Sequence, residues 1–381
     1  MLPRRRRLRG CALALVCGIT IAACATSAAS RPGPVPVLSN YERSTGNVIA
    51  RDCGYSSPVP GRPSRSVWLF CDTEVTSPDG RTLRGLILGT DSAAAGPYQA
   101  GQAPSVLSEI PTPPNPLTSA SDAPQPFLPA PQNLSLPGTT LPCSGAGAYP
   151  AAWISGLTRA SLTEGALLLT FDEYCVTGTT NTAEGFGLAE YDPVDNILSP
   201  AVLPFTSFGG FPLPPQQVLG SPVTERDGYL YLFGFCPAAV PPTACGGRVF
   251  VARTIAAPAD WQSPSSYQYW TGAGWSPQAA MAGSVVPGGQ AIGVSVADYA
   301  AVGHGLVMIE QTSLAGDFQA WQAASPAGPW RRLLSGRVPC AEADGLCRAL
   351  IGHPELSTPD RLLISYFDPG NNHVDVSAYP W

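Results

Sequence analysis

The sequence has 381 residues and carries 27 acidic against 21 basic side chains, a formal net charge of −6. An acidic chain of this kind has no electrostatic reason to bind nucleic acid, so we expect no nucleic-acid partner. The 42 prolines and 40 glycines leave little room for helices and favour an all-β fold built from short strands.

The first 30 residues have the features of an export signal. "MLPRRRRLRG" is basic, and the apolar stretch that follows it is too short to span a bilayer comfortably. Residues 21–24 (Ile-Ala-Ala-Cys) resemble a bacterial lipobox, which predicts cleavage before Cys24 and lipidation of its thiol. The alternative is an ordinary cleavage site within "ATSAAS". We therefore expect a signal peptide over residues 1–23 and a flexible tether over residues 24–44.

This leader also predicts where the chain resides. The mature protein is expected to be exported and to sit on the outer face of the cytoplasmic membrane as a lipoprotein, or to be secreted. Its contact with the membrane would run through the lipid anchor only. A monomer is expected.

Eight cysteines follow Cys24, and an even number in an exported chain indicates disulfide bonds. They are Cys53, Cys71, Cys143, Cys175, Cys236, Cys245, Cys340 and Cys347. The sequence does not fix their connectivity, but consecutive pairing would staple four local hairpins or loops. A zinc site would need closely spaced CxxC motifs, which this chain does not contain.

One apolar hairpin recurs five times along the chain. Its most apolar strands are centred on Leu69, Leu168, Tyr231, Val307 and Leu363. A strand rich in small residues precedes each of them, and a third apolar strand follows. Such repeats predict a five-bladed β-propeller, because stacked blades bury faces that a single hairpin leaves exposed.

The expected propeller covers residues 45–381 and has one long interruption. Residues 95–138 are rich in proline and serine and have no strand pattern, so we expect an insertion between blades one and two, either a mobile flap or a disordered loop. The segment "YERSTGNVIAR", just before Asp52, is expected to supply the strand that completes the last blade.

Ligands of small propellers bind at the axial mouth, so useful carboxylates should lie on or near the first strand of each blade. Acid–base chemistry at such a mouth would use carboxyl groups. The candidate catalytic residues are Asp52, Asp172 and Glu355, and His353 is a candidate for organising the site. Each has a structural alternative: a turn-capping aspartate for Asp52, for example, and a packed core histidine for His353.

Several other residues are weaker candidates. The acids are Asp72, Glu173, Glu225 and Asp298, which have the character of strand ends or solvated turns. Trp270 and Trp275 lie in an aromatic-rich segment and are candidates for a substrate-binding platform, because aromatic faces stack on sugars. The alternative for these tryptophans is packing between blades.

Four segments carry a resemblance to a catalogued family: "RDCGYSSPVPGRPSRSVWLFCDT", "GSPVTERDGYLYLFGF", "ASPAGPW" and "GHPELSTPDRLLISYF". Over roughly residues 45–381 the chain resembles domain-of-unknown-function family 4185. That family is similar in architecture to five-bladed glycosidases that cleave furanosides. Some members are implicated in cleaving D-arabinan, a cell-envelope polysaccharide of mycolic-acid bacteria.

The resemblance implies roles for two residues. The base of those furanosidases is an aspartate on the first strand of blade one, which Asp52 matches. A histidine of the last blade organises a metal or water at the axis, which His353 matches, so an axial Ca²⁺ or other ion is implied. The chain departs from the pattern at Ser221 and Ser295, where those enzymes carry an aspartate and a glutamate.

Three functions therefore stay open at this stage. The first is a glycoside hydrolase-like propeller that acts on a cell-envelope polysaccharide, with D-arabinan as one candidate. The second is a propeller that binds carbohydrate without catalysis. The third is a scaffold lipoprotein that binds other proteins through its blade edges or through its insertion.

Overall fold

The computed structural model describes residues 33–79, 83–87, 91–104, 106–114, 123–128, 143, 148–161, 165–177, 180–206, 218–225, 227–236, 246–340 and 346–381. The expectations for the signal peptide, and for Cys24 in particular, lie outside these residues. Within the described ranges, no helix is long and apolar enough to cross a membrane.

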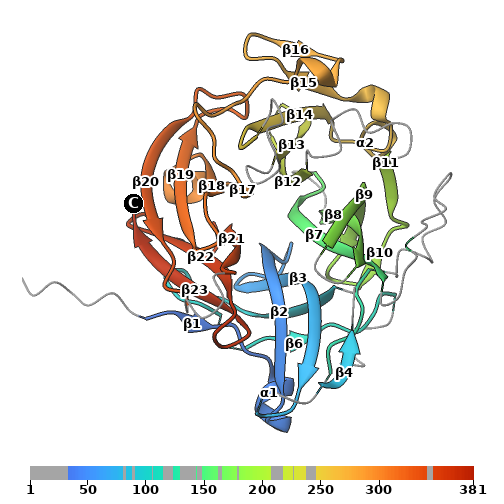
Figure 1. Ribbon diagram of the computed structural model, residues 1–381, viewed down its shortest axis with the longest axis vertical. Helices are drawn as coiled ribbons and strands as arrows, with labels where there is room; N and C mark the ends of the chain where they lie inside the picture. Colours follow the sequence, from blue (N-terminus) through green and yellow to red (C-terminus); the bar gives the residue numbers. More distant parts are fainter. Residues whose placement is uncertain are drawn as a thin grey trace, which may run out of the picture. The chain divides into compact units, whose positions relative to one another are not determined.

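The strands form five antiparallel sheets, each of which is one blade (Figure 1). Blade one contains β2 (Val48–Pro58), β3 (Arg65–Thr76), β4 (Leu83–Ile87), β5 (Ser92–Pro97) and β6 (Ser108–Glu109). Blade two contains β7 (Tyr149–Arg159), β8 (Leu167–Thr177), β9 (Thr180–Asp192), β10 (Ile197–Leu198) and β11 (Val202–Thr206). Blade three contains β12 (Val218–Thr224), β13 (Tyr229–Phe235), β14 (Val249–Ile255), β15 (Gln268–Trp270) and β16 (Trp275–Ser276).

The last two blades complete the ring. Blade four contains β17 (Gly293–Asp298), β18 (Leu306–Gln311), β19 (Asp317–Ala323) and β20 (Arg331–Arg337). Blade five contains β21 (Arg348–Gly352), β22 (Arg361–Asp368), β23 (His373–Pro380) and β1 (Val35–Pro36). The helical turns are α1 (Asn40–Thr45), α2 (Pro258–Trp261), η3 (Pro264–Ser266), η4 (Ala279–Met281) and η5 (Ala300–Val302).

The innermost strands β2, β7, β12, β17 and β21 contact one another in a closed cycle, β21 against β2 included. This arrangement confirms the predicted five-bladed β-propeller, and the five apolar strands found by repeat are the second strands of their blades. We call the side on which the five innermost strands begin the start face and the side on which they end the end face.

The innermost strands approach so closely that several positions cannot carry a larger side chain. A Cβ atom on Gly156 would lie 2.1 Å from Pro222 Cδ on the neighbouring strand. The axial serines join strands as well: Ser221 Oγ accepts a hydrogen bond from the Val296 backbone, and Ser295 Oγ accepts one from the Gly352 backbone. The small residues that depart from the furanosidase pattern therefore hold the axis together.

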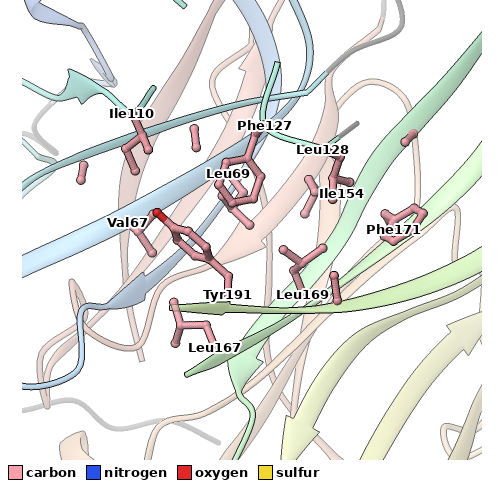
Figure 2. Close-up of a cluster of buried hydrophobic side chains, with 14 of the residues drawn as sticks. Val67, Leu69, Ile110, Phe127, Leu128, Ile154, Leu167, Leu169, Phe171 and Tyr191 are labelled. Carbon is pink, nitrogen blue, oxygen red and sulfur yellow. The ribbon is translucent and has the colours of Figure 1, made fainter. Parts of the chain in front are cut away.

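Neighbouring blades share apolar cores. Figure 2 shows the cluster between blades one and two, where Leu69 of β3 meets Ile154 of β7 and Phe171 of β8. All three are essentially buried. Burial of both faces of each hairpin is the physical reason for the repeat seen in the sequence.

The insertion expected over residues 95–138 is not a separate loop where the structure describes it. Part of β5 and all of β6 fall within it, and both strands pair into blade one. Phe127 and Leu128 also enter the core between blades one and two (Figure 2). For the described residues the expectation was wrong, because half of β5 is alanine, a residue with little strand preference, and its pairing with β3 determines its conformation.

The strand that completes blade five also differs from the expectation. It is β1, which pairs with β23, and "YERSTGNVIAR" instead forms most of α1 and the beginning of β2. The expected tether therefore ends earlier than residue 44. Ser39 caps α1 and is fully buried, and Glu42 completes a capping box.

The predicted disulfides are present wherever the structure describes both partners. Cys53–Cys71, Cys143–Cys175 and Cys340–Cys347 are bonded in consecutive order. Cys236 is also disulfide-bonded, and Cys245 lies outside the described residues.

Asp91 anchors part of the former insertion and makes stability pH-dependent. Its Oδ1 accepts hydrogen bonds from the Phe127 and Leu128 backbones at 3.1 and 2.7 Å, and burial raises its pKa to about 8. Between pH 4 and 8 the folded chain therefore holds a proton that the unfolded chain releases, and stability falls as pH rises, by about 1.4 kcal/mol per unit at most. Asp91→Asn should flatten this slope in urea unfolding, whereas exposed Asp195→Asn should leave it unchanged. Equal slopes in both variants would contradict the assignment.

Candidate active site

Two aspartates are held side by side on the start face by a disulfide. Asp52 precedes Cys53 on β2, and Asp72 follows Cys71 on the adjacent strand β3. The bond between these cysteines fixes their Cα atoms 5.4 Å apart. A carboxylate oxygen of Asp52 lies within 4.8 Å of both sulfur atoms. Because the sulfurs are bonded to each other, they are not available as thiolate ligands, and this cluster does not fit a metal ion.

Asp52 is paired with a cation from the last blade. Its Oδ2 accepts a hydrogen bond from Arg348 Nε at 2.7 Å, across the contact of β2 with β21. The guanidinium stacks over the ring of Phe367, with its Cζ 4.6 Å from the ring centre. This ion pair orients the Asp52 carboxylate.

The pKa of Asp72 lies well above its ordinary value. Burial, together with the negative charge of Asp52, raises its pKa to about 7. Trp153 of β7 donates its indole N–H to Asp72 Oδ1 at 2.7 Å, which fixes the carboxyl group in place. At neutral pH a large fraction of Asp72 is therefore protonated and able to donate a proton.

Asp172 lies in the same region, opposite Trp153 in the register of β7 and β8. It is buried, and burial raises its pKa well above the ordinary value, opposed by a hydrogen bond from Ser155. Burial raises the pKa of Tyr55 and Tyr174, and the charge of Asp172 adds to both shifts. The structure thus brings together the predicted candidates Asp52 and Asp172 and adds Asp72.

The neighbouring aspartates suit acid–base chemistry. Two carboxyl groups whose environments push their pKa values apart provide a proton donor and a charged base or nucleophile at the same pH. Here the raised pKa of Asp72 suits a proton donor, and Asp52, held by Arg348, is the neighbouring carboxyl group. Sequence reasoning ranked Asp72 too low. Asp72 follows Cys71, and Cys71 is bonded to Cys53, the residue after Asp52. Consecutive pairing of these cysteines was the signal that could have found it.

Glu355 is not part of this arrangement. Its side chain is buried, 2% exposed, and accepts a hydrogen bond from Ser56 Oγ. Ser56 lies four residues beyond Asp52 on β2, about 13 Å toward the end face. Glu355 lines a second cavity, of about 750 Å³, together with Pro58 and Tyr98, so it lies apart from the aspartates and its catalytic role stays a prediction.

His353 organises packing rather than a metal. Its Nδ1 lies 2.6 Å from Ser56 Oγ and its Nε2 lies 2.7 Å from Ser365 Oγ. Its ring also stacks on Trp68, with the ring centres 4.8 Å apart. Both ring nitrogens have protein partners, so the residues present do not fit the axial ion implied by the furanosidase resemblance.

The predicted tryptophan platform lies elsewhere. Trp270 and Trp275 are on β15 and β16, the outermost strands of blade three, where their ring centres are 5.4 Å apart. The guanidinium of Arg253 covers the Trp275 ring at 4.2 Å. The two residues are therefore separated from the carboxylates by the width of a blade. Of the remaining weaker candidates, Glu225 and Asp298 line a cavity at the end face, and Glu173 is buried on β8.

The comparisons with known proteins leave the family open. The family model that matches is described as "Domain of unknown function (DUF5005)" and covers residues 215–379. This match corrects the expected membership of family 4185, which rested on short segments that propeller blades commonly share. No curated protein matches the sequence.

Similar solved structures are remote in sequence. A GH43 β-xylosidase/α-arabinofuranosidase from a compost microbial metagenome has 9% identity and a TM-score of 0.48, covering 92% of this chain and 94% of that chain. The GH43_1 enzyme from Xanthomonas citri, complexed with xylotriose, has 10% identity and a TM-score of 0.46, covering 91% and 89%. A protein of unknown function from Dyadobacter fermentans has 10% identity and a TM-score of 0.45, covering 91% and 98%. The fold assignment rests on the five sheets and not on these likenesses.

Proposed function

We propose that this chain is an exported, lipid-anchored glycoside hydrolase-like propeller that acts on a cell-envelope polysaccharide, with D-arabinan as the first substrate to test. The observation that carries the proposal is the pair Asp52 and Asp72, held together by the Cys53–Cys71 disulfide, with Asp52 paired to Arg348 and the pKa of Asp72 raised to about 7. Such a pair is the minimum equipment for cleaving a glycosidic bond.

The proposed reaction assigns a separate role to each carboxyl group. Asp72 gives its proton to the glycosidic oxygen as that oxygen leaves the anomeric carbon. In the same step Asp52 either deprotonates the water that attacks the anomeric carbon, or attacks that carbon itself to form a glycosyl-enzyme ester. In the second case the Asp72 carboxylate deprotonates a water that hydrolyses the ester, which releases the sugar and the Asp52 carboxylate and returns the proton to Asp72. Arg348 keeps Asp52 oriented through its hydrogen bond, and Trp153 keeps Asp72 oriented through its indole N–H.

Export is supported by the cysteine chemistry. Three disulfides are formed between cysteines of the described residues, and such bonds persist in oxidising compartments outside the cytoplasm. The basic and apolar leader with its lipobox at Cys24 agrees with this location. A lipid on that cysteine would keep the enzyme beside its envelope substrate.

The test is to incubate the purified mature chain with D-arabinan, arabinogalactan and xylan, and to measure the release of reducing ends. Release from at least one of these glycans is the expected result. Retention on an immobilised glycan without any release would contradict hydrolysis and support the non-catalytic binding function. If no glycan were cleaved and none were retained, both hydrolysis and non-catalytic binding would be contradicted for these glycans.

A further inference from the structure

A cavity of about 410 Å³ runs into the ring from the end face, where all five blades contribute to its wall. Each innermost strand lines it with its final residues, from Tyr55 on β2 to Gly352 on β21. We call it the axial cavity. Its volume lies near the lower limit of the range for small-molecule sites, which suits a single compact ligand.

The axial cavity is separate from the aspartate pair. Asp52, Asp72 and Asp172 do not line it, and among the β2 residues that do, Tyr55 is the nearest to Asp52 along the strand. Tyr55 therefore lies between the two regions, facing the cavity while the charges of Asp172 and Asp52 act on its hydroxyl. A ligand in the cavity would contact the protein without touching the pair.

Apart from three charged side chains near the strand ends, the wall offers neutral hydroxyl groups. Thr158 Oγ1 has no hydrogen-bond partner among the described residues, and it lines the cavity from β7. Ser295 Oγ accepts from the Gly352 backbone, and its own proton has no acceptor in the described part of the chain. Each hydroxyl can both donate and accept, which matches the hydroxyl groups of a sugar.

The other wall groups limit the ligand further. The rings of Pro58, Pro222 and Pro354 supply apolar surface for the C–H faces of a sugar. At the mouth one guanidinium, Arg159, stands against two carboxylates, Glu225 and Asp298. The mouth is therefore net negative, which disfavours an anionic ligand.

We propose that the axial cavity binds one neutral sugar residue from the end face, through the hydroxyls of Thr158 and Ser295. This site goes beyond the proposed hydrolysis and does not depend on it. A glycan bound there would hold the propeller on its polymer while the start face remains open.

The test measures binding in the Asp52→Asn protein by isothermal titration or saturation-transfer NMR, so that turnover does not interfere. The probes are methyl α-D-arabinofuranoside, methyl β-D-xylopyranoside and D-galacturonate. Saturable binding of a neutral glycoside, at least tenfold tighter than that of galacturonate, is the expected result. Thr158→Val should weaken it about tenfold by removing one hydrogen-bonding group, whereas Thr158→Ser, which keeps the hydroxyl, should not.

A cavity-filling variant makes the assignment stricter. Ala297→Trp places an indole in the axial cavity and should abolish binding, with folding checked by circular dichroism. Binding that survives both Thr158→Val and a folded Ala297→Trp would overturn the assignment to this cavity. The assignment would also be overturned if both neutral glycosides failed to bind saturably, or if galacturonate bound more tightly than either of them. None of these outcomes depends on whether the chain hydrolyses a glycan.

Discussion

Replacing Asp52 with asparagine is expected to lower kcat on a susceptible glycan by about 10²–10⁴-fold, with little change in KM. Asparagine keeps the size of the side chain and an oxygen for Arg348 but loses the negative charge that attacks or deprotonates. The measurement is initial-rate release of reducing ends by the wild type and the variant at several substrate concentrations. Asp195→Asn, an exposed acid of blade two, is the matched control and should retain full activity.

The pH profile distinguishes the two roles. The donor must be protonated, so activity should fall as pH rises through about 7, the pKa of Asp72. Asp52→Asn removes a charge that raises the pKa of Asp72. The alkaline fall of any residual activity should therefore move to a lower pH. Asp72→Asn should be inactive on glycans with poor leaving groups at every pH. A wild-type profile that stays flat from pH 6 to 9 would exclude Asp72 as the proton donor.

The sequence predicted the repeated part of this molecule and missed its exceptions. The apolar strands around Leu69 and Leu363 are strongly patterned because they are buried on both faces between blades. By contrast, β5 and β1 carry almost no pattern of their own, and both form because β3 and β23 present open edges to them. Local sequence does not contain that information.

The same distinction applies to the candidate site. Asp52 was predicted from its place on an innermost strand. Asp72 became a candidate proton donor only through its neighbour. The register of β2 and β3 and the bond between Cys53 and Cys71 bring it next to Asp52. Glu355, in contrast, follows β21 and lies against Ser56, toward the face opposite to Asp52. Side-chain environment, which decides acid–base roles, followed from packing between blades.

Glu109→Ala should destabilise the protein by about 3–5 kcal/mol, the largest stability effect we expect from one substitution. Glu109 on β6 pairs with Arg51 on β2 at 3.1 Å, and the two side chains are only 1% and 2% exposed. The guanidinium also lies over the ring of Phe70, 3.7 Å from its centre. Removing the carboxylate would leave a buried cation without a partner. Urea unfolding of the variant and the wild type measures the difference.

Two further proteins show whether the cost comes from the unpaired charge. Arg51→Met combined with Glu109→Leu removes both charges and keeps apolar volume, so it should recover most of the lost stability. Asp317→Ala breaks an exposed pair, in which the Asp317 side chain is 38% exposed and that of Arg337 is 57% exposed. This change should cost no more than about 1 kcal/mol. If the double variant were as unstable as Glu109→Ala, the loss would stem from packing of β6 instead. Because β6 belongs to the segment that composition marked as a loose insertion, a large effect would also establish that this segment is an integral strand of blade one.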